Sequence, residues 1–297
     1  MPAFMIASLF FYVQKRMVNK SYFRKRTVRL VQILCFWWPV YFLLTQLTSF
    51  PLVPNSLLGV FLIPFLNGAC YFLGGLVFCI FCIEIIERAI EKLPQQYANL
   101  ALIAFTILGF VIAIIVRNFI PHNSEILVQA IGLGPLAFLI YPASMVVFAH
   151  WTKAKSITTL LGMGIVFQII EVCRIAQMSG VNSSNVLDIL QLNYGSPVIV
   201  PIALVIVLMF ESLKIEKLNA FTRWVATYAL GIYLVHPIVI AGANRLTHDQ
   251  FLFMFAKTIN VSSGTIGINP FSISAVMAAS FVIVNALGKS PLKRFVC

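Results

Sequence analysis

Ionisable and polar side chains recur at helical spacing inside two long apolar stretches of the sequence. Gln168, Glu171 and Arg174 follow one another at intervals of three residues, and Tyr233 and His236 have the same spacing. Residues three apart lie on the same face of a helix. An ionisable group inside a membrane span costs several kcal/mol unless it is paired, so such groups are functional candidates by default.

These residue types are suited to proton transfer. A carboxylate can orient a histidine that takes the proton of a sugar hydroxyl. Both Glu171 and His236 are expected in the outer half of their spans, where they could meet in one outward-opening cavity. We therefore predict His236, Glu171 and Tyr233 as catalytic residues and Arg174 and Gln168 as substrate contacts. The simpler interpretation, that Glu171 pairs with Arg174 and that His236 bonds a backbone group, stays open.

A basic run precedes the second apolar stretch. Arg24, Arg26 and Arg29 stand in this run. Guanidinium groups bind phosphates in a bidentate geometry, so these arginines could clamp the phosphates of a cytoplasmic acyl donor such as coenzyme A. Positive-inside topology and the anionic lipids of the inner leaflet are the alternative explanation of such a run.

Other chemistry-bearing residues carry a weaker signal. The glutamates between residues 84 and 91 are expected to decorate a cytoplasmic helix end, and His150 lies at the edge of a loop. Cys79 and Cys82 form a C-x-x-C inside an apolar stretch, but no second cysteine or histidine pair accompanies them in the sequence. We therefore predict neither a metal site nor a redox cofactor.

The composition shows what kind of element must position these residues. Of the 297 residues, 60% are hydrophobic and 10% are charged, whereas a soluble domain is about half apolar and about a quarter charged. A soluble fold is thereby excluded, because one core could not bury so much apolar surface. A bilayer, in contrast, accommodates about 20 apolar residues in each helical span.

Nine apolar segments, nearly all of spanning length, are expected to form helices. They fall at residues 1–13, 30–48, 70–86, 98–116, 126–149, 157–176, 196–213, 225–243 and 270–288. The first is short and is interpreted as the second half of a helix. Residues 57–66, interrupted by Pro64, are interpreted as re-entrant or interfacial. We predict an all-α, polytopic transmembrane bundle that forms one domain over residues 1–297.

The distribution of positive charge orients this bundle. A net charge of +12 can indicate a nucleic-acid partner, but here the lysines and arginines lie in short runs between apolar segments. Seven, two, two, three and three of them fall in residues 14–29, 87–97, 150–156, 214–224 and 289–297, against three in the alternate connections. Cytoplasmic loops retain Lys and Arg. We therefore predict a cytoplasmic C-terminus, Met1 outside and no nucleic-acid partner.

Two stretches resemble the acyltransferase type 3 family of integral membrane O-acyltransferases. The stronger is LNAFTRWVATYALGIYLVHPIVI at 218–240, which is similar to a late helix of the family in which a G-I-Y-L-x-H-P string is common. The other runs from the apolar N-terminus through SYFRKRTVRL into an aromatic, Pro-containing helix. It contains Arg26-x-x-Arg29, which matches the family's R-x-x-R pattern. The resemblance also covers, more loosely, Tyr233 and His236.

The resemblance implies a reaction and its partners. An acetyl or similar acyl group would move from cytoplasmic acetyl-CoA, the donor substrate, to a sugar hydroxyl of a lipid-linked or cell-surface glycan at a bacterial inner membrane. No metal or tightly bound cofactor is implied. The alternatives are a transporter or flippase for glycan lipids and an inactive membrane fragment or subunit.

The resemblance also implies one further helix. Family members have ten core helices with both ends cytoplasmic, and their first helix carries a basic residue and a histidine regarded as essential for acyl transfer. That helix has no counterpart among the nine segments. We expect an N-terminally incomplete domain, either because its start is mis-set or because it is a natural truncation.

The orientation can be tested with topology tags. Tags at residue 20, within residues 87–97 and at the C-terminus should be cytoplasmic, because these connections hold most of the lysines and arginines. Tags near residues 52, 120 and 185 should be external. Cytoplasmic labelling at residue 120 or 185 would contradict the predicted orientation.

Overall fold

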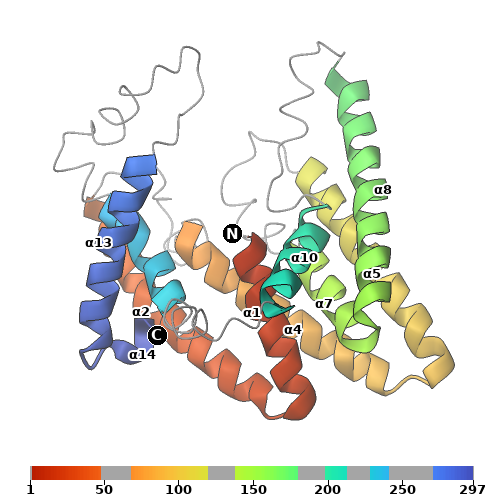
Figure 1. Ribbon diagram of the computed structural model, residues 1–297, viewed down its shortest axis with the longest axis horizontal. Coiled ribbons are helices and arrows are strands. Elements are labelled where there is room, and N and C mark those ends of the chain that lie inside the picture. The colour runs from red at the N-terminus through yellow and green to blue at the C-terminus, as the bar shows by residue number, and fades with distance from the viewer. Residues whose placement is uncertain are drawn as a thin grey trace. The chain divides into compact units, whose positions relative to one another are not determined.

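The computed structural model describes residues 2–47, 68–119, 138–179, 198–212, 228–240 and 270–296. Within these residues every regular element is a helix and no strand occurs, which confirms the all-α prediction. Each of the nine apolar segments contains a helix (Figure 1). The segment 57–66, expected to be re-entrant or interfacial, lies outside the described residues.

The described helices have the following bounds. They are α1 (Pro2–Val18), α2 (Tyr22–Leu47), α4 (Gly68–Glu91), α5 (Gln95–Phe119), α7 (Ile140–His150), α8 (Lys153–Ser179), α10 (Ile199–Ser212), the helix Tyr228–Ile240, α13 (Pro270–Gly288) and α14 (Lys293–Val296). The four-residue helix α14 follows the last apolar segment and was not expected from the sequence.

The helices form two compact units. Unit 1 comprises Met1–Arg29 and Phe72–Leu213, and unit 2 comprises Leu30–Tyr71 and Lys214–Cys297. The single helix α2 begins in unit 1 and continues in unit 2. Each unit is described by itself, and the organisation of the chain as one domain stays a prediction.

The helix α7 is central to unit 1. All of its residues from Ile140 to Val147 are buried, and α1, α5, α8 and α10 pack against it. A helix that is apolar all round belongs in such an interior position. The Ser144 hydroxyl donates a hydrogen bond to the Ile140 carbonyl oxygen at 2.6 Å, so this polar group is satisfied within the helix.

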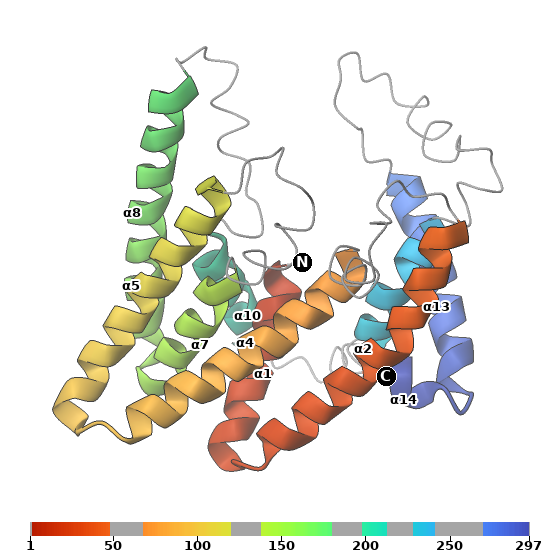
Figure 2. The same ribbon diagram turned by 180° about the vertical axis from the view of Figure 1, so that it is seen from behind.

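Three short connections lie at the same end of unit 1 (Figures 1 and 2). They join α1 to α2 at 19–21, α4 to α5 at 92–94, and α7 to α8 at 151–152. In the last of them, the Trp151 Nε1 donates a hydrogen bond to the Asn99 Oδ1 of α5 at 3.0 Å. All three connections belong to the lysine- and arginine-rich set. A bundle that crosses a membrane requires this arrangement, because alternate connections return to the same side.

The helix α8 has the clearest membrane character among the described helices. Its stretch Lys153–Cys173 is the one that is long and apolar enough to cross a membrane by length and composition, and the other apolar stretches in the described residues are shorter. Four large apolar side chains of α8 are about half exposed: Ile165, Val166, Ile169 and Ile170. A continuous exposed apolar face of this kind indicates contact with lipid or with another protein.

Aromatic side chains hold the described helices of unit 2 together. The Trp37 Nε1 of α2 donates a hydrogen bond to the Phe295 carbonyl oxygen of α14 at 3.0 Å. One turn further along α2, the Tyr41 hydroxyl donates a hydrogen bond to the Leu234 carbonyl oxygen. The first bond fixes α14 on α2, and the second fixes the helix Tyr228–Ile240 on α2.

The glycine at position 109 allows a close approach of α5 to the start of α7. A Cβ atom at Gly109 would lie 3.0 Å from the Leu139 carbonyl oxygen and 3.1 Å from the Ala143 Cβ. A Cβ atom at Gly162 of α8, in contrast, would have nothing within 4 Å apart from its chain neighbours and the backbone of its own helix. The two glycines therefore differ in packing although both lie inside apolar helices.

We expect Gly109→Leu to lower the thermal midpoint of the purified protein, because overpacking costs about 1–3 kcal/mol. One kcal/mol corresponds to roughly 2–4 °C in a domain of similar size. The matched control is Gly162→Leu, which should be neutral or slightly stabilising since leucine has the higher helix propensity. Thermal unfolding followed by intrinsic fluorescence measures both variants, and equal midpoints would refute the assigned packing.

Candidate functional site

The basic run lies on the first two turns of α2. Arg24 and Arg29 are exposed and Arg26 is partly buried. Burial lowers the pKa of Arg26, with nearby Tyr22 opposing this effect and Arg29 adding to it. No acidic residue stands in the first turn, and the N-terminus of a helix already carries partial positive charge. The start of α2 therefore attracts anions, which suits either phosphates of a donor or lipid headgroups.

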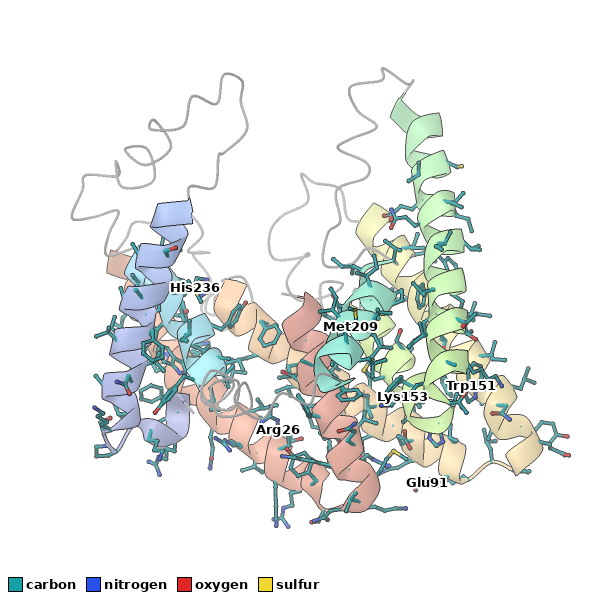
Figure 3. All side chains as sticks on the ribbon, viewed as in Figure 1. Arg26, Glu91, Trp151, Lys153, Met209 and His236 are labelled. Carbon is teal, nitrogen blue, oxygen red and sulfur yellow. The ribbon has the colours of Figure 1, made fainter. Side chains whose placement is uncertain are left out.

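Figure 3 locates this run within unit 1. Arg26 lies toward the same end of the unit as Glu91, Trp151 and Lys153, which belong to the ends of α4, α7 and α8 at the short connections. The predicted donor-binding residues are thus on the side of unit 1 that we predict to be cytoplasmic. A water-soluble acyl donor would reach them there without entering the bilayer.

The polar face of α8 turns inward. Glu171 is only 1% exposed, whereas the adjacent Ile169 and Ile170 are on the exposed face. The Oε1 atom of Gln168 is buried and accepts no hydrogen bond within the described part of the chain. A buried carbonyl oxygen without a donor costs about 1–3 kcal/mol, so a polar ligand at Gln168 would be favoured. The side chain of Arg174 lies outside the described residues.

The histidine of the helix Tyr228–Ile240 has a defined proton arrangement. The Nδ1 of His236 lies 2.7 Å from the Tyr233 carbonyl oxygen. Because a carbonyl oxygen only accepts hydrogen bonds, Nδ1 carries the proton and the Nε2 of the neutral ring keeps a lone pair. The rings of Tyr233 and His236 lie 5.4 Å apart. The backbone bond expected in the simpler interpretation is present, and it leaves Nε2 able to accept a proton.

The two predicted halves of the catalytic site belong to different units. Glu171 and Gln168 lie in unit 1, and Tyr233 and His236 lie in unit 2. The meeting of Glu171 and His236 in one cavity therefore stays a prediction. Among the described residues no group of three or more His, Cys, Asp or Glu side chains could hold a metal ion.

A buried charge network, not expected from the sequence, lies where α1, α4 and α7 end. The Arg16 Nε is 2.9 Å from a carboxylate oxygen of Glu84, and its Nη1 is 3.3 Å from one of Glu87. The Nε2 of His150 lies 3.1 Å from the same Glu87 oxygen. Arg16 and Glu87 are each 4% exposed. Glu84 and Glu87 are therefore not exposed decoration of a helix end, because Arg16 draws them into the bundle.

The sequence predicts the acidic part of this network but not all of its cationic partners. Positions 84, 87 and 91 have the spacing of one helix face, and three carboxylates on one face near an apolar segment need cations. Arg88, four residues after Glu84, supplies one of them at 2.9 Å. The other two cations, Arg16 and Lys20, are 68 and 71 residues away in the sequence from Glu84 and Glu91, and helical spacing cannot find them.

The His150 contact should make the stability depend on pH. Its hydrogen bond with Glu87 raises the pKa of His150 above the ordinary 6.5, although burial opposes the shift. A raised folded-state pKa contributes stability that is fully present below the unfolded pKa and is lost as the pH rises through the folded value. His150→Ala should therefore lower the thermal midpoint more at about pH 5.5 than at about pH 9.

A double-mutant cycle isolates this contact. In a Glu87→Gln background, the effect of His150→Ala on the thermal midpoint should become nearly independent of pH, because the carboxylate that raises the pKa is absent. A pH dependence that persists in that background would assign the effect to another group.

Comparison with known proteins identifies the family. Residues 1–285 match the sequence profile of the acyltransferase 3 family, described as an acyltransferase domain. No curated protein and no solved structure matches the chain significantly. The matched range includes the arginines of α2, the inward face of α8 and the helix Tyr228–Ile240. The family expected from the sequence is confirmed: the chain belongs to the acyltransferase 3 family, whose members are membrane proteins.

Proposed function

We propose that the protein is a multi-pass O-acyltransferase of a bacterial inner membrane. It moves an acetyl group from cytoplasmic acetyl-CoA to a sugar hydroxyl of a lipid-linked or cell-surface glycan. The observation that carries the proposal is the family match over residues 1–285, which includes both the Arg26–Arg29 pair and His236. The family supports acyl transfer as the reaction, and the donor and the acceptor are proposed from what the family resemblance implies.

The multi-pass arrangement is supported by the outer surfaces of the described helices. Large apolar side chains on several helices are more than half exposed, among them Ile85 of α4, Leu100 of α5 and Val282 of α13. Water would solvate such surfaces poorly, but lipid chains solvate them well. The common placement of the three lysine- and arginine-rich connections at one end of unit 1 is what the positive-inside rule requires.

The donor is proposed to bind at the start of α2. Arg26 and Arg29 are three residues apart and share a helix face, and Arg24, two residues before Arg26, adds positive charge to the start of the same helix. Bidentate guanidinium contacts suit the diphosphate of coenzyme A. The partial burial of Arg26 restricts its side chain, so less conformational freedom is lost when a phosphate binds.

The transfer step requires a base, a carbonyl activator and a path for the acyl group. In the proposed reaction the thiol arm of the donor carries the thioester from the cytoplasmic end into the bundle. There the Nε2 of His236 takes the proton of the sugar hydroxyl while the hydroxyl oxygen attacks the thioester carbonyl carbon. The carbon–sulfur bond breaks, and the protonated His236 gives its proton to the leaving coenzyme A thiolate. Tyr233 would donate a hydrogen bond to the developing oxyanion, and Glu171 would orient the histidine. Gln168 and Arg174 would contact the glycan.

The test uses cells that carry the gene with its native upstream sequence, compared with a deletion strain. Acetyl-ester content of the surface glycan should be lost on deletion and restored by the wild-type gene. In membranes, Arg26→Ala and Arg29→Ala should each raise the apparent KM for acetyl-CoA about tenfold or more, because a charge-assisted phosphate contact contributes about 1.5–3 kcal/mol. The thermal midpoint of Arg29→Ala should change little, since substitutions of exposed residues usually stay within about 0.5 kcal/mol.

The control is Lys92→Ala. It removes an exposed positive charge from the connection between α4 and α5, away from α2, so the KM should stay close to the wild-type value. An unchanged KM in both arginine variants would favour lipid anchoring as the role of the basic run. Unchanged glycan acetylation in the deletion strain would refute the proposed acceptor.

A further inference from the structure

A pocket of about 350 Å³ lies in unit 2 between α2 and α14. Its lining residues are Gln32, Cys35 and Phe36 from α2 and Arg294 and Phe295 from α14. The volume lies in the usual range of small-molecule sites, about 300–1,000 Å³. The lining contains a guanidinium, a primary amide and two aromatic rings, and it contains no carboxylate. These groups favour an anionic, partly aromatic ligand.

The walls of the pocket are fixed by contacts that leave its polar groups accessible. The rings of Phe36 and Phe295 stack with centroids 4.3 Å apart and an interplanar angle of 8°. The Trp37 Nε1 bond to the Phe295 carbonyl oxygen holds the backbone of α14 against α2. Gln32 and Arg294 are both exposed. The guanidinium of Arg294 lies 4.7 Å from the Phe295 ring centroid, which presents it at the pocket beside an aromatic surface.

This set of groups matches a purine nucleotide. A glutamine amide can bond the N6 and N7 atoms of adenine in a bidentate manner. Aromatic rings and guanidinium planes stack on bases, and a guanidinium also pairs with a phosphate. A simple inorganic anion would use Arg294 alone and would leave the amide and the aromatic rings without a role.

The position of the pocket on α2 relates it to the proposed donor site. Gln32 comes three residues after Arg29 on one continuous helix, which corresponds to about 4.5 Å along the helix axis on a neighbouring part of the same face. In coenzyme A, a single ribose joins the diphosphate to the adenine and carries the 3′-phosphate. A diphosphate held by Arg26 and Arg29 would therefore bring the base and the 3′-phosphate to the next turn of α2.

We propose that the pocket between α2 and α14 binds the adenine base and the ribose 3′-phosphate of the acyl donor. Gln32 bonds the edge of the base, and Arg294 pairs with the 3′-phosphate. The inference rests on the proposed function, because it identifies which part of the donor enters the pocket. Arg294 and Phe295 lie beyond the residues 1–285 that match the family, so selection of a 3′-phosphorylated donor is assigned to this chain's own C-terminal segment.

The thiol of Cys35 provides a native reporter of the pocket. Cys35 is a free, exposed cysteine in the pocket wall, and Cys173 on α8 is a free, exposed cysteine outside it. Purified full-length protein is alkylated with iodoacetamide, and the modification of each cysteine is followed by peptide mass spectrometry. Adenosine 3′,5′-bisphosphate should slow the alkylation of Cys35 and leave that of Cys173 unchanged. Adenosine 5′-monophosphate, which lacks the 3′-phosphate, should protect Cys35 at concentrations about tenfold higher.

Two neighbouring basic residues make a matched pair of variants. Arg294→Ala should remove the difference between the two nucleotides, because it removes the partner of the 3′-phosphate. Lys293→Ala, which removes an exposed charge that does not line the pocket, should retain the difference. Arg294→Lys should retain part of it, since the charge remains but the bidentate geometry is lost.

The outcomes separate this inference from the proposed function. Equal protection of Cys35 by the two nucleotides in the wild type, or equal discrimination by Arg294→Ala and Lys293→Ala, overturns the inference. Acetyl-CoA-dependent glycan acetylation combined with an unprotected Cys35 overturns the inference and leaves the proposed function in place. Selective protection of Cys35 without glycan acetylation supports the nucleotide pocket and contradicts the proposed acceptor.

Discussion

The cost of placing a charge in apolar surroundings governs how unit 1 is built. Arg16 sits where its charge cannot reach water freely, and it is compensated by Glu84 and Glu87, with Glu91 at 3.7 Å. A buried ion pair is tolerated when good geometry and further hydrogen bonds satisfy both partners. Here Glu87 also meets His150. The charge balance thereby fixes the ends of α1, α4 and α7 against one another.

The cost of burying a charge also explains where other polar residues of the described helices lie, either in the interior or at an exposed surface. On α8, Glu171 faces the interior while the isoleucines beside it face outward. At the start of α2, in contrast, the arginines have no acidic residue in their own first turn, and two of them are exposed. The charges of the network at Arg16 lie mostly buried against one another, whereas the run on α2 lies largely at an exposed surface. That difference separates a structural cluster from a surface that can bind an anion.

The sequence separation between interacting residues explains how much of the structure could be predicted. The helices follow from apolar runs about one span long, so their positions are local properties of the sequence. The inward face of Glu171 is also local, because lipid excludes a carboxylate. The pairing of Arg16 with Glu84 crosses 68 residues, and that of Trp37 with Phe295 crosses 258. The periodicity of a single sequence does not relate such distant positions. The charge network and the α2–α14 pocket could therefore be found only in the three-dimensional structure.

The helix α1 packs against α7 and α10, which are translated much later than α1. This packing can therefore form only late in the synthesis of the chain. The first residue of α10, Ile199, is translated 181 positions after Val18, the last residue of α1. At about 5–20 residues per second, the ribosome needs roughly 10–40 s to cover that distance. Until then, the side of α1 that will meet α10 lacks this partner. The helix α1 is therefore complete well before unit 1 can close, and α10 is the last described helix to join unit 1.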